Sequence, residues 1–336
     1  MGGKHDKKQN EKTKKSRKGL KIFFIILMIL IIIIAGIAVG ALSYVKSKLS
    51  KINYEDLPKD EIEVNAGVEE KLEKYRNIAL LGLDARTDSF SGSRSDCIMI
   101  ISINEETKDV RLFSIYRDTY LELTNRGLDK INHAYAYGGA KLSLSSINTN
   151  LDLNITEYVT INFDTVKAVV DAVGGVKMTV TDAEANSIPG ITSAGTYNLN
   201  GEQALAYGRI RKIDTDYKRT ERMRDVLTAV FNKVKTLSVG ELNNLVDTIL
   251  PHVRTNISSS EILTMLPQIA SYKIGDSIGW PYVVKAYTTP TWYGAPVTLE
   301  SNVIRLHQEL FDEEDYEPSE KVKEISNKII KKTGYR

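Results

Sequence analysis

Asn77-Ile-Ala-Leu-Leu-Gly-Leu-Asp84 decides the fold, together with two apolar runs that follow it, Cys97-Ile-Met-Ile-Ile-Ser-Ile103 and the segment from Val110 to Tyr116. Each run is too short for a typical helix, is dominated by Ile, Leu and Val, and is bounded by polar residues. This pattern is typical of a buried strand. We therefore expect three neighbouring strands at the centre of a sheet.

Strand order then predicts a cluster of charges. If the three strands form an antiparallel meander, the first ends at Asp84, the second begins at Asp96, and the third ends at Arg117-Asp118, all at one edge of the sheet. The two aspartates would repel each other unless a cation lay between them, and a hard dication suits carboxylates when phosphate completes its shell. Solvent and turns also favour Asp and Arg at strand ends, which explains each residue singly.

A second group of cations lies downstream, in Arg209-Ile-Arg-Lys-Ile-Asp-Thr-Asp-Tyr-Lys-Arg-Thr-Glu-Arg222. Arg209 and Arg211 share a face if this part is extended, and Arg219 and Arg222 share a face if it is helical. A guanidinium group binds phosphate through paired N–H donors, so the cluster favours a pyrophosphate ligand. The alternative is a solvated face on which nearby acids such as Asp214 neutralise the arginines.

Composition narrows the function classes. The 336 residues include 45 Lys and Arg against 43 Asp and Glu, with 42% hydrophobic and 26% charged residues, which suits about two domains or one domain with extensions. The single cysteine, Cys97, excludes an internal disulfide and every multi-cysteine metal motif. Nucleophile-elbow, phosphate-loop, zinc-protease and dinucleotide motifs are missing from the sequence.

The N-terminal region predicts a membrane anchor. Residues 1–21 form a tail with nine basic and two acidic residues, and the 24 residues from 22 to 45 carry no charge. That length spans about 36 Å as a helix, longer than the apolar part of a cleavable signal peptide, which is the alternative. The positive-inside rule keeps the tail in the cytoplasm. We expect the remaining residues outside the cell membrane, where their acidic balance argues against nucleic acid as a partner.

The rest of the chain mixes helical and strand patterns without strict alternation. Helices are expected at 68–75, 140–151, 165–173, 201–207, 219–235, 242–250, 260–269 and 303–310, and further strands at 158–163 and 176–180. This mixture predicts an α/β (α+β) fold in which helices cover both faces of an open mixed sheet. We expect a stalk over 46–76, a core over 77–235, and an extension over 236–336 that packs on the core, contains an aromatic-rich segment and ends in a charged tail.

The motifs together resemble the LytR-CpsA-Psr proteins of bacterial cell envelopes. The matching pieces, in the family's order, are Gly82-Leu-Asp84-Ala-Arg86, Arg94-Ser-Asp96, Ser114-Ile-Tyr-Arg117-Asp118, Lys130-Ile-Asn-His-Ala-Tyr135 with Gly138-Gly139, Asp171-Ala-Val-Gly-Gly175, Arg209-Ile-Arg211, and Asp216-Tyr-Lys-Arg219 with Arg222. Each motif is weak alone, whereas their combination is specific. The basic tail and the single apolar span also fit the family's plan.

The resemblance implies a phosphotransferase that moves a glycopolymer, such as wall teichoic acid or capsular polysaccharide, from an undecaprenyl-pyrophosphate carrier to peptidoglycan. It implies that Asp84 and Asp96 hold Mg²⁺ and that the lipid occupies an apolar tunnel between sheet and helices. The residues implied to clamp the pyrophosphate are Arg117, Arg209, Arg211 and Arg219, with Arg86, Lys130 and Arg222 in support. Asp118 is the candidate for positioning or deprotonating the acceptor hydroxyl, with Asp96 as the alternative.

Two residues depart from the family pattern. Tyr116 stands where the family usually has proline, and Met223 stands where it has glutamine. We expect the first change to be tolerated, because a strand end needs no particular φ, and the second to alter the contacts around Arg222. Two other functions stay open: a sensor of lipid-linked glycans without turnover, and a hydrolase that transfers the phosphate to water.

Overall fold

The computed structural model describes residues 47, 50–51, 53–85, 90–211, 213–214, 216–234, 236–265, 268 and 271–336. The basic tail expected at 1–21 and the apolar span expected at 22–45 lie outside these residues. Among the residues described, no helix has both the length and the apolar character that crossing a bilayer requires. The chain divides into two compact units, Met1–Lys51 and Ile52–Arg336, and the elements below belong to the second.

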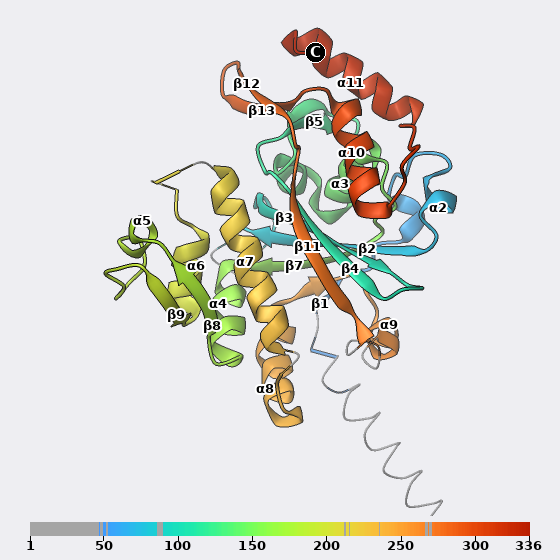
Figure 1. Ribbon diagram of the computed structural model, residues 1–336. Helices are drawn as coiled ribbons and strands as arrows, with labels where there is room; N and C mark the ends of the chain where they lie inside the picture. Colours follow the sequence, from blue (N-terminus) through green and yellow to red (C-terminus); the bar gives the residue numbers. More distant parts are fainter. Residues whose placement is uncertain are drawn as a thin grey trace, which may run out of the picture. The chain divides into compact units, whose positions relative to one another are not determined.

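A mixed sheet forms the centre of this unit (Figure 1). Across the described part of the chain, its seven strands lie in the spatial order β1 (Asn53–Tyr54), β10 (Arg254–Thr255), β7 (Glu157–Asn162), β2 (Tyr75–Leu83), β3 (Ser95–Asn104), β4 (Asp109–Ile115) and β11 (Lys273–Trp280). β2, β3 and β4 are consecutive antiparallel neighbours, while β2 pairs in parallel with β7 and β4 in parallel with β11. The predicted mixed sheet and its central meander are confirmed, and the three strands begin and end within two residues of the apolar runs.

Helices and short ribbons surround the sheet. The ribbons pair β5 (Tyr120–Leu123) with β6 (Gly127–Lys130), β8 (Val176–Val180) with β9 (Gly195–Leu199), and β12 (Val284–Thr288) with β13 (Trp292–Pro296). The helices are α2 (Val68–Lys71), α3 (His133–Leu151), α4 (Phe163–Ala172), α5 (Asp182–Ala185), α6 (Gly201–Gly208), α7 (Asp216–Val234), α8 (Val239–Ile249), α9 (Ser259–Met265), α10 (Leu299–Phe311) and α11 (Glu320–Thr333). Single 3₁₀ turns lie at Lys59–Glu61 and Leu250–His252.

The largest apolar core lies on one face of the sheet, under α3, α10 and α11. Alternate residues of β2, Ala79, Leu81 and Leu83, are fully buried there. α3 contributes Leu144 and Ile147 to the same cluster. Because the intervening residues face a second covered surface, the strands have continuous apolar sequences instead of alternating ones.

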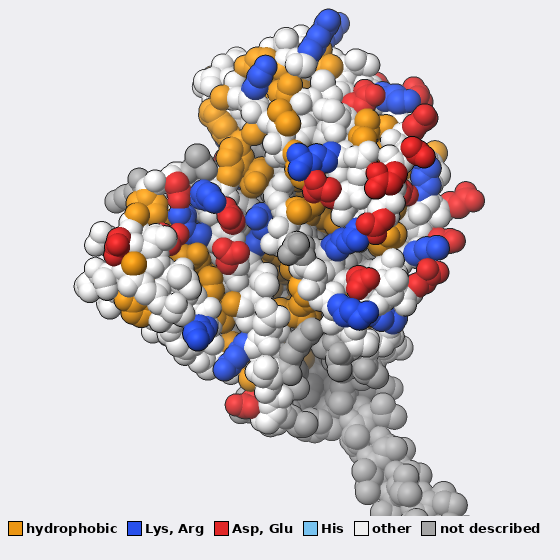
Figure 2. Space-filling view, in the orientation of Figure 1, with side chains coloured by type: hydrophobic (Ala, Val, Ile, Leu, Met, Phe, Trp, Pro, Cys, Tyr) orange, Lys and Arg blue, Asp and Glu red, His pale blue; other side chains and the backbone are white. Residues whose placement is uncertain are grey.

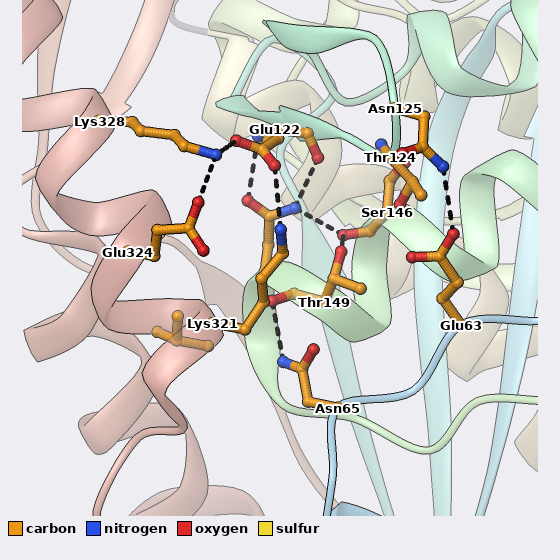
Figure 3. Close-up of polar contacts among 12 residues, drawn as sticks. Glu63, Asn65, Glu122, Thr124, Asn125, Ser146, Thr149, Lys321, Glu324 and Lys328 are labelled. Atoms are coloured by element: carbon orange, nitrogen blue, oxygen red, sulfur yellow. Dashed lines mark hydrogen bonds and ion pairs between the residues drawn. The ribbon is translucent and has the colours of Figure 1, made fainter.

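Residues 320–333 form a helix, so the prediction of a charged tail at the C-terminus is wrong. Val322 and Ile325 of α11 are fully buried in the main core, whereas its lysines lie on the opposite face. Two of these, Lys321 and Lys328, lie 3.2 and 2.6 Å from the two carboxylate oxygens of Glu122 in β5 (Figure 3). The many charges conceal an amphipathic helix that is fixed to the β5 ribbon.

The segment before β2 also belongs to the folded unit. Ile62, Val68 and Leu72 are buried in the main core, and the helix expected at 68–75 is the single turn α2 followed by the start of β2. Because β1 at Asn53–Tyr54 is also a strand of the central sheet, the stalk expected over 46–76 is wrong from residue 53 onward. These three apolar residues are separated by many charged residues, so the sequence pattern does not indicate that all three face the core.

The second face of the sheet is covered by α7 and α9 and is less completely closed. Leu227 of α7 and Ile262 of α9 share a small apolar cluster with the sheet. Leu80, Ile101 and Val159 on this face stay half-buried. A third cluster joins the β8–β9 ribbon with α4, α5, α6, α7 and α8.

The boundary expected at residue 235 does not separate two parts of the structure. β10 and β11 come from the expected C-terminal extension, yet both are strands of the central sheet. β11 pairs residue by residue with β4, for example Ile278 with Phe113. The extension thus completes the core in addition to packing against it.

Candidate active site

Three central strands bring charged residues to one edge of the sheet, as their order predicts. β2 ends one residue before Asp84, β3 contains Asp96 as its second residue, and β4 ends two residues before Arg117. The antiparallel register of the three strands places these points side by side. Figure 2 shows basic and acidic side chains interleaved near the upper end of α7, which lies over this region.

A β-bulge directs Asp96 away from the regular ladder. Gly82 pairs with Cys97 and Leu83 pairs with Ser95, so Asp96 is an extra residue without a partner in β2. Bulges of this kind often lie next to active sites because they re-aim a side chain. Glycine is needed at position 82, since a Cβ there would lie 2.9 Å from the Cβ of Cys97.

Asp96 is a buried carboxylate surrounded by donors. Nη1 of Arg117 donates to its Oδ2 at 2.7 Å, and Nδ2 of Asn132 donates to its Oδ1 at 3.2 Å. Nη2 of Arg211 lies 3.7 Å from the same Oδ2. Only 7% of the Asp96 side chain is exposed, so the aspartate holds both guanidinium groups at the edge of the sheet.

The charges continue in an alternating row. Nε of Arg117 lies 3.3 Å from Oδ2 of Asp118, and Nζ of Lys130 lies 2.9 Å from Oδ1 of Asp118. The β5–β6 ribbon positions Lys130, because it pairs that residue with Tyr120 immediately after the edge. Arg211, Asp96, Arg117, Asp118 and Lys130, here called the edge cluster, thus form one connected network.

Two of the other predicted arginines lie beside the edge cluster. Nη2 of the buried Arg219 donates to the backbone oxygen of Asp96 at 3.2 Å. Arg209 caps the C-terminus of α6, is exposed, and lies 4.8 Å from the ring centre of Phe163. Asp96, Arg209 and Arg219 all line one small cavity of about 10 Å³. Cations that lie more than a hundred residues after Asp96 in sequence therefore meet it in space.

Arg222 has a different environment. Its side chain is 6% exposed, and it pairs with Glu184 at 2.6 Å and with Asp214. Burial raises the pKa of Glu184, but hydrogen bonds from Thr181 and Arg222 outweigh burial and leave the pKa below its ordinary value. The acidic neighbours neutralise this arginine, so its supporting contact with a pyrophosphate stays a prediction.

The remaining predicted residues are Asp84 and Arg86. Asp84 is exposed at the same edge, and its backbone N–H donates to the carbonyl of Arg94 at 3.1 Å. Arg86 lies outside the described residues. The part of the chain that the structure describes contains no group of three or more His, Cys, Asp or Glu side chains that could hold a metal. The donor set still suits Mg²⁺, because two carboxylates are enough when substrate phosphate and water complete the shell.

Sequence reasoning did not single out Asn132, which donates to Asp96, although it lies inside the Lys130-Ile-Asn-His motif. It also gave no role to Glu184, which is remote in sequence from Arg222. Tyr116 makes a contact that a proline could not make, since its N–H donates to the carbonyl of Trp280 at 2.9 Å. Met223 lines the small cavity beside Arg219, where an amide would add hydrogen-bonding groups.

Known proteins resemble this chain along most of its length. A model of the LytR_cpsA_psr family matches residues 39–277. A Bacillus subtilis protein named polyisoprenyl-teichoic acid–peptidoglycan teichoic acid transferase TagT is 34% identical over 254 residues, which are 72% of this chain and 79% of that protein. A Bacillus cereus (strain AH820) protein of the same description, TagU, is 35% identical over 232 residues, which are 68% of this chain and 75% of that one.

Solved structures resemble the fold as well. A structure described as TagT bound to LIIa-WTA matches with a TM-score of 0.58 and 27% identity, covering 83% of this chain and 97% of its own. Another, described as the LytR-CPS2A-psr family protein YwtF (TagT) with bound octaprenyl pyrophosphate lipid, matches with a TM-score of 0.53 and 25% identity. It covers 78% of this chain and 91% of its own.

Proposed function

Because this chain belongs to the LytR-CpsA-Psr family, we propose that it is an enzyme that transfers a glycopolymer from a polyprenyl-pyrophosphate carrier to peptidoglycan. The relatives named as teichoic acid transferases favour wall teichoic acid as the polymer, with capsular polysaccharide as the alternative. We take undecaprenyl as the carrier lipid. The observation that carries the proposal is the edge cluster with Arg219 and Arg209 beside it, which offers several guanidinium groups to one diphosphate.

The reaction is a phosphoryl transfer. A sugar hydroxyl of peptidoglycan attacks the phosphorus next to the glycan, a new P–O bond forms, and the bond to the distal, lipid-linked phosphate breaks. The products are a phosphodiester and polyprenyl phosphate. Positioning and charge neutralisation are the main contributions to stabilising such a transition state, and the guanidinium groups of arginine supply both.

Arg117, Arg211 and Arg219 would neutralise the diphosphate oxygens. Asp96 sets their spacing, because it contacts all three through its carboxylate or its backbone oxygen. Arg209 is exposed at the rim and would complete the clamp. When bound between Asp84 and Asp96, Mg²⁺ would act as a Lewis acid and lower the charge on the transferring phosphate.

Asp118 is the better placed of the two candidates for handling the hydroxyl proton. Its side chain is 16% exposed against 7% for Asp96, so an incoming hydroxyl reaches it more readily. Arg117 and Lys130 fix its orientation from either side. The carboxylate would accept the proton as the new P–O bond forms and later release it to solvent.

The half-covered face of the sheet would bind the lipid chain. Leu80, Ile101 and Val159 present apolar surface between the sheet and α7 that the protein itself leaves half-exposed. This surface extends from the edge cluster along the strands, so a chain attached to the diphosphate would follow it. The uncharged stretch 22–45 would anchor the enzyme in the cell membrane, with the basic tail in the cytoplasm and the catalytic unit outside.

The test is turnover of a fluorescent lipid-pyrophosphate glycan by the full-length protein with isolated peptidoglycan. We expect the glycan label to become covalently attached to peptidoglycan. Cleavage of the phosphodiester should release the attached label, and no label should be attached when EDTA removes Mg²⁺. Label appearing only as free glycan phosphate would show a hydrolase instead. Binding of the lipid without any turnover would show a sensor.

A further inference from the structure

The β12–β13 ribbon lies directly against the edge cluster. The N–H of Gly294 in β13 donates to the carbonyl of Asp118 at 3.0 Å, and Gly294 forms a parallel bridge with Thr119. Nζ of Lys130 lies 5.5 Å from the ring centre of Tyr293. A segment that comes late in the chain thus forms one wall beside the residue that we propose handles the acceptor proton.

This ribbon carries more aromatic surface than its own packing needs. Trp292 is 39% exposed and Val283, just before β12, is 52% exposed. Tyr287 and Tyr293 face each other on the opposite side of the ribbon, with ring centres 6.2 Å apart, and pack against Tyr120. Trp292 is thus the ring that the packing of the ribbon leaves open. Figure 2 shows apolar side chains gathered over the ribbon, next to the charged region. Exposed apolar patches rimmed by polar groups commonly mark binding sites.

The absence of a side chain at Gly294 keeps the surface open. A Cβ there would lie 3.4 Å from the Trp292 ring and 3.5 Å from the hydroxyl of Tyr217 in α7. The Tyr217 ring lies 4.3 Å from the ring of Tyr116, which directly precedes Arg117. Trp292 and Tyr217 therefore meet beside Gly294, together with a methyl group of Val284, and Tyr217 in turn contacts Tyr116 at the start of the edge cluster.

We infer that the aromatic surface of β12–β13, with Trp292 as its anchor, binds the glycan strand of the acceptor. The inference rests on the proposed function and names the acceptor's subsite. Sugar rings present a face of C–H groups with partial positive charge, which matches the negative face of an aromatic ring, while their hydroxyls need polar neighbours. The face of the ribbon that carries Trp292 offers both, because the hydroxyl of Tyr217 lies on this face beside Gly294. A sugar on Trp292 would have its hydroxyls directed along the ribbon toward Asp118.

The lipid of the donor is a poorer match for this surface. A polyprenyl chain needs extended apolar surface, and the sheet face under α7 offers it through the half-buried Leu80, Ile101 and Val159. With the acceptor glycan strand on the ribbon and the donor's lipid under α7, the acceptor and the lipid approach the diphosphate from different sides. An attacking hydroxyl and a leaving phosphate need this arrangement for in-line displacement.

Tryptophan fluorescence can test the inference independently of turnover. The chain has two tryptophans, and Trp280 is fully buried, so acrylamide quenches mainly Trp292. Soluble glycan strands freed of their peptides should protect Trp292 of the full-length protein from quenching. In the transfer assay, Trp292→Ala should raise the KM for glycan strands roughly tenfold, as expected for an aromatic anchor, and Trp292→Phe should restore most of the affinity.

The matched control is Tyr54→Ala. Tyr54 is 55% exposed on β1, which is the outermost strand of the sheet on the side away from β11. It should leave the KM for glycan unchanged. Glycan strands that give no protection, or an unchanged glycan KM in folded Trp292→Ala, would overturn the inference while leaving the transferase proposal intact. Protection of Trp292 in a protein that transfers nothing would instead support the glycan site and refute the transferase. Protection by lipid pyrophosphate but not by glycan would assign the surface to the donor and overturn the inference.

Discussion

Arg117→Ala should abolish most transfer while leaving the protein folded. The guanidinium lies 2.7 Å from Asp96 and 3.3 Å from Asp118, and only 17% of the side chain is exposed. Loss of one preorganised contact to a charged transition state costs on the order of 10²–10³ in kcat. The cost in stability is smaller than the roughly 3–5 kcal/mol of an orphaned buried charge, because Asp96 keeps Asn132 and Arg211 and Asp118 keeps Lys130. A loss of about 1–2 kcal/mol would lower the Tm by roughly 2–8 °C.

The assay compares transfer rate and Tm for Arg117→Ala and Arg117→Lys with a matched control. Arg111→Ala is that control: Arg111 lies in β4, the strand that leads to Arg117, and its side chain is 34% exposed in a surface ion pair with Asp312. We expect the control to retain its activity. Lysine keeps the charge but loses the paired donors, so Arg117→Lys should be intermediate. Full activity in folded Arg117→Ala would remove the edge cluster from the mechanism, and complete unfolding would make the arginine structural.

Three further outcomes are expected. Arg222→Ala should lower the free energy of unfolding in urea by about 3–5 kcal/mol, because it leaves Glu184 buried without its cation; a change below about 1 kcal/mol would contradict this. Gly82→Ala should cost about 1–3 kcal/mol, because the new methyl group meets Cys97, and an unchanged urea midpoint would exclude the predicted clash. Burial raises the pKa of the Cys97 thiol to about 11, so iodoacetamide at pH 8 should label the native protein much more slowly than the unfolded protein; mass spectrometry showing equal labelling rates would refute this.

The sequence predicts the charged edge of the sheet well because β2, β3 and β4 are consecutive in the chain and pair with their neighbours in sequence. The runs that become β2, β3 and β4 are apolar, short and joined by polar loops, so an antiparallel meander brings Asp84, Asp96 and Arg117-Asp118 to one edge without further information. The bulge that singles out Asp96 has no comparable signal. It depends on the close approach of Gly82 to β3, which the pattern of apolar residues does not encode.

Contacts between distant segments are the part that the pattern could not supply. Arg219 and Arg222 are three residues apart on one helix, yet Arg219 contacts Asp96 while Arg222 contacts Glu184 in α5. Which of them meets a carboxylate from β3 depends on how α7 rotates against the sheet. For the same reason the sequence predicts a charged tail where α11 forms. Val322 and Ile325 can be recognised as core residues only once the helix is packed against the main core.

The most direct test of the central claim is electron density for this protein with a polyprenyl pyrophosphate bound. The diphosphate should lie within hydrogen-bonding distance of Arg117, Arg211 and Arg219, with the lipid along the sheet face under α7. A diphosphate bound elsewhere, with the alternating row of Asp96, Arg117, Asp118 and Lys130 undisturbed, would contradict the account.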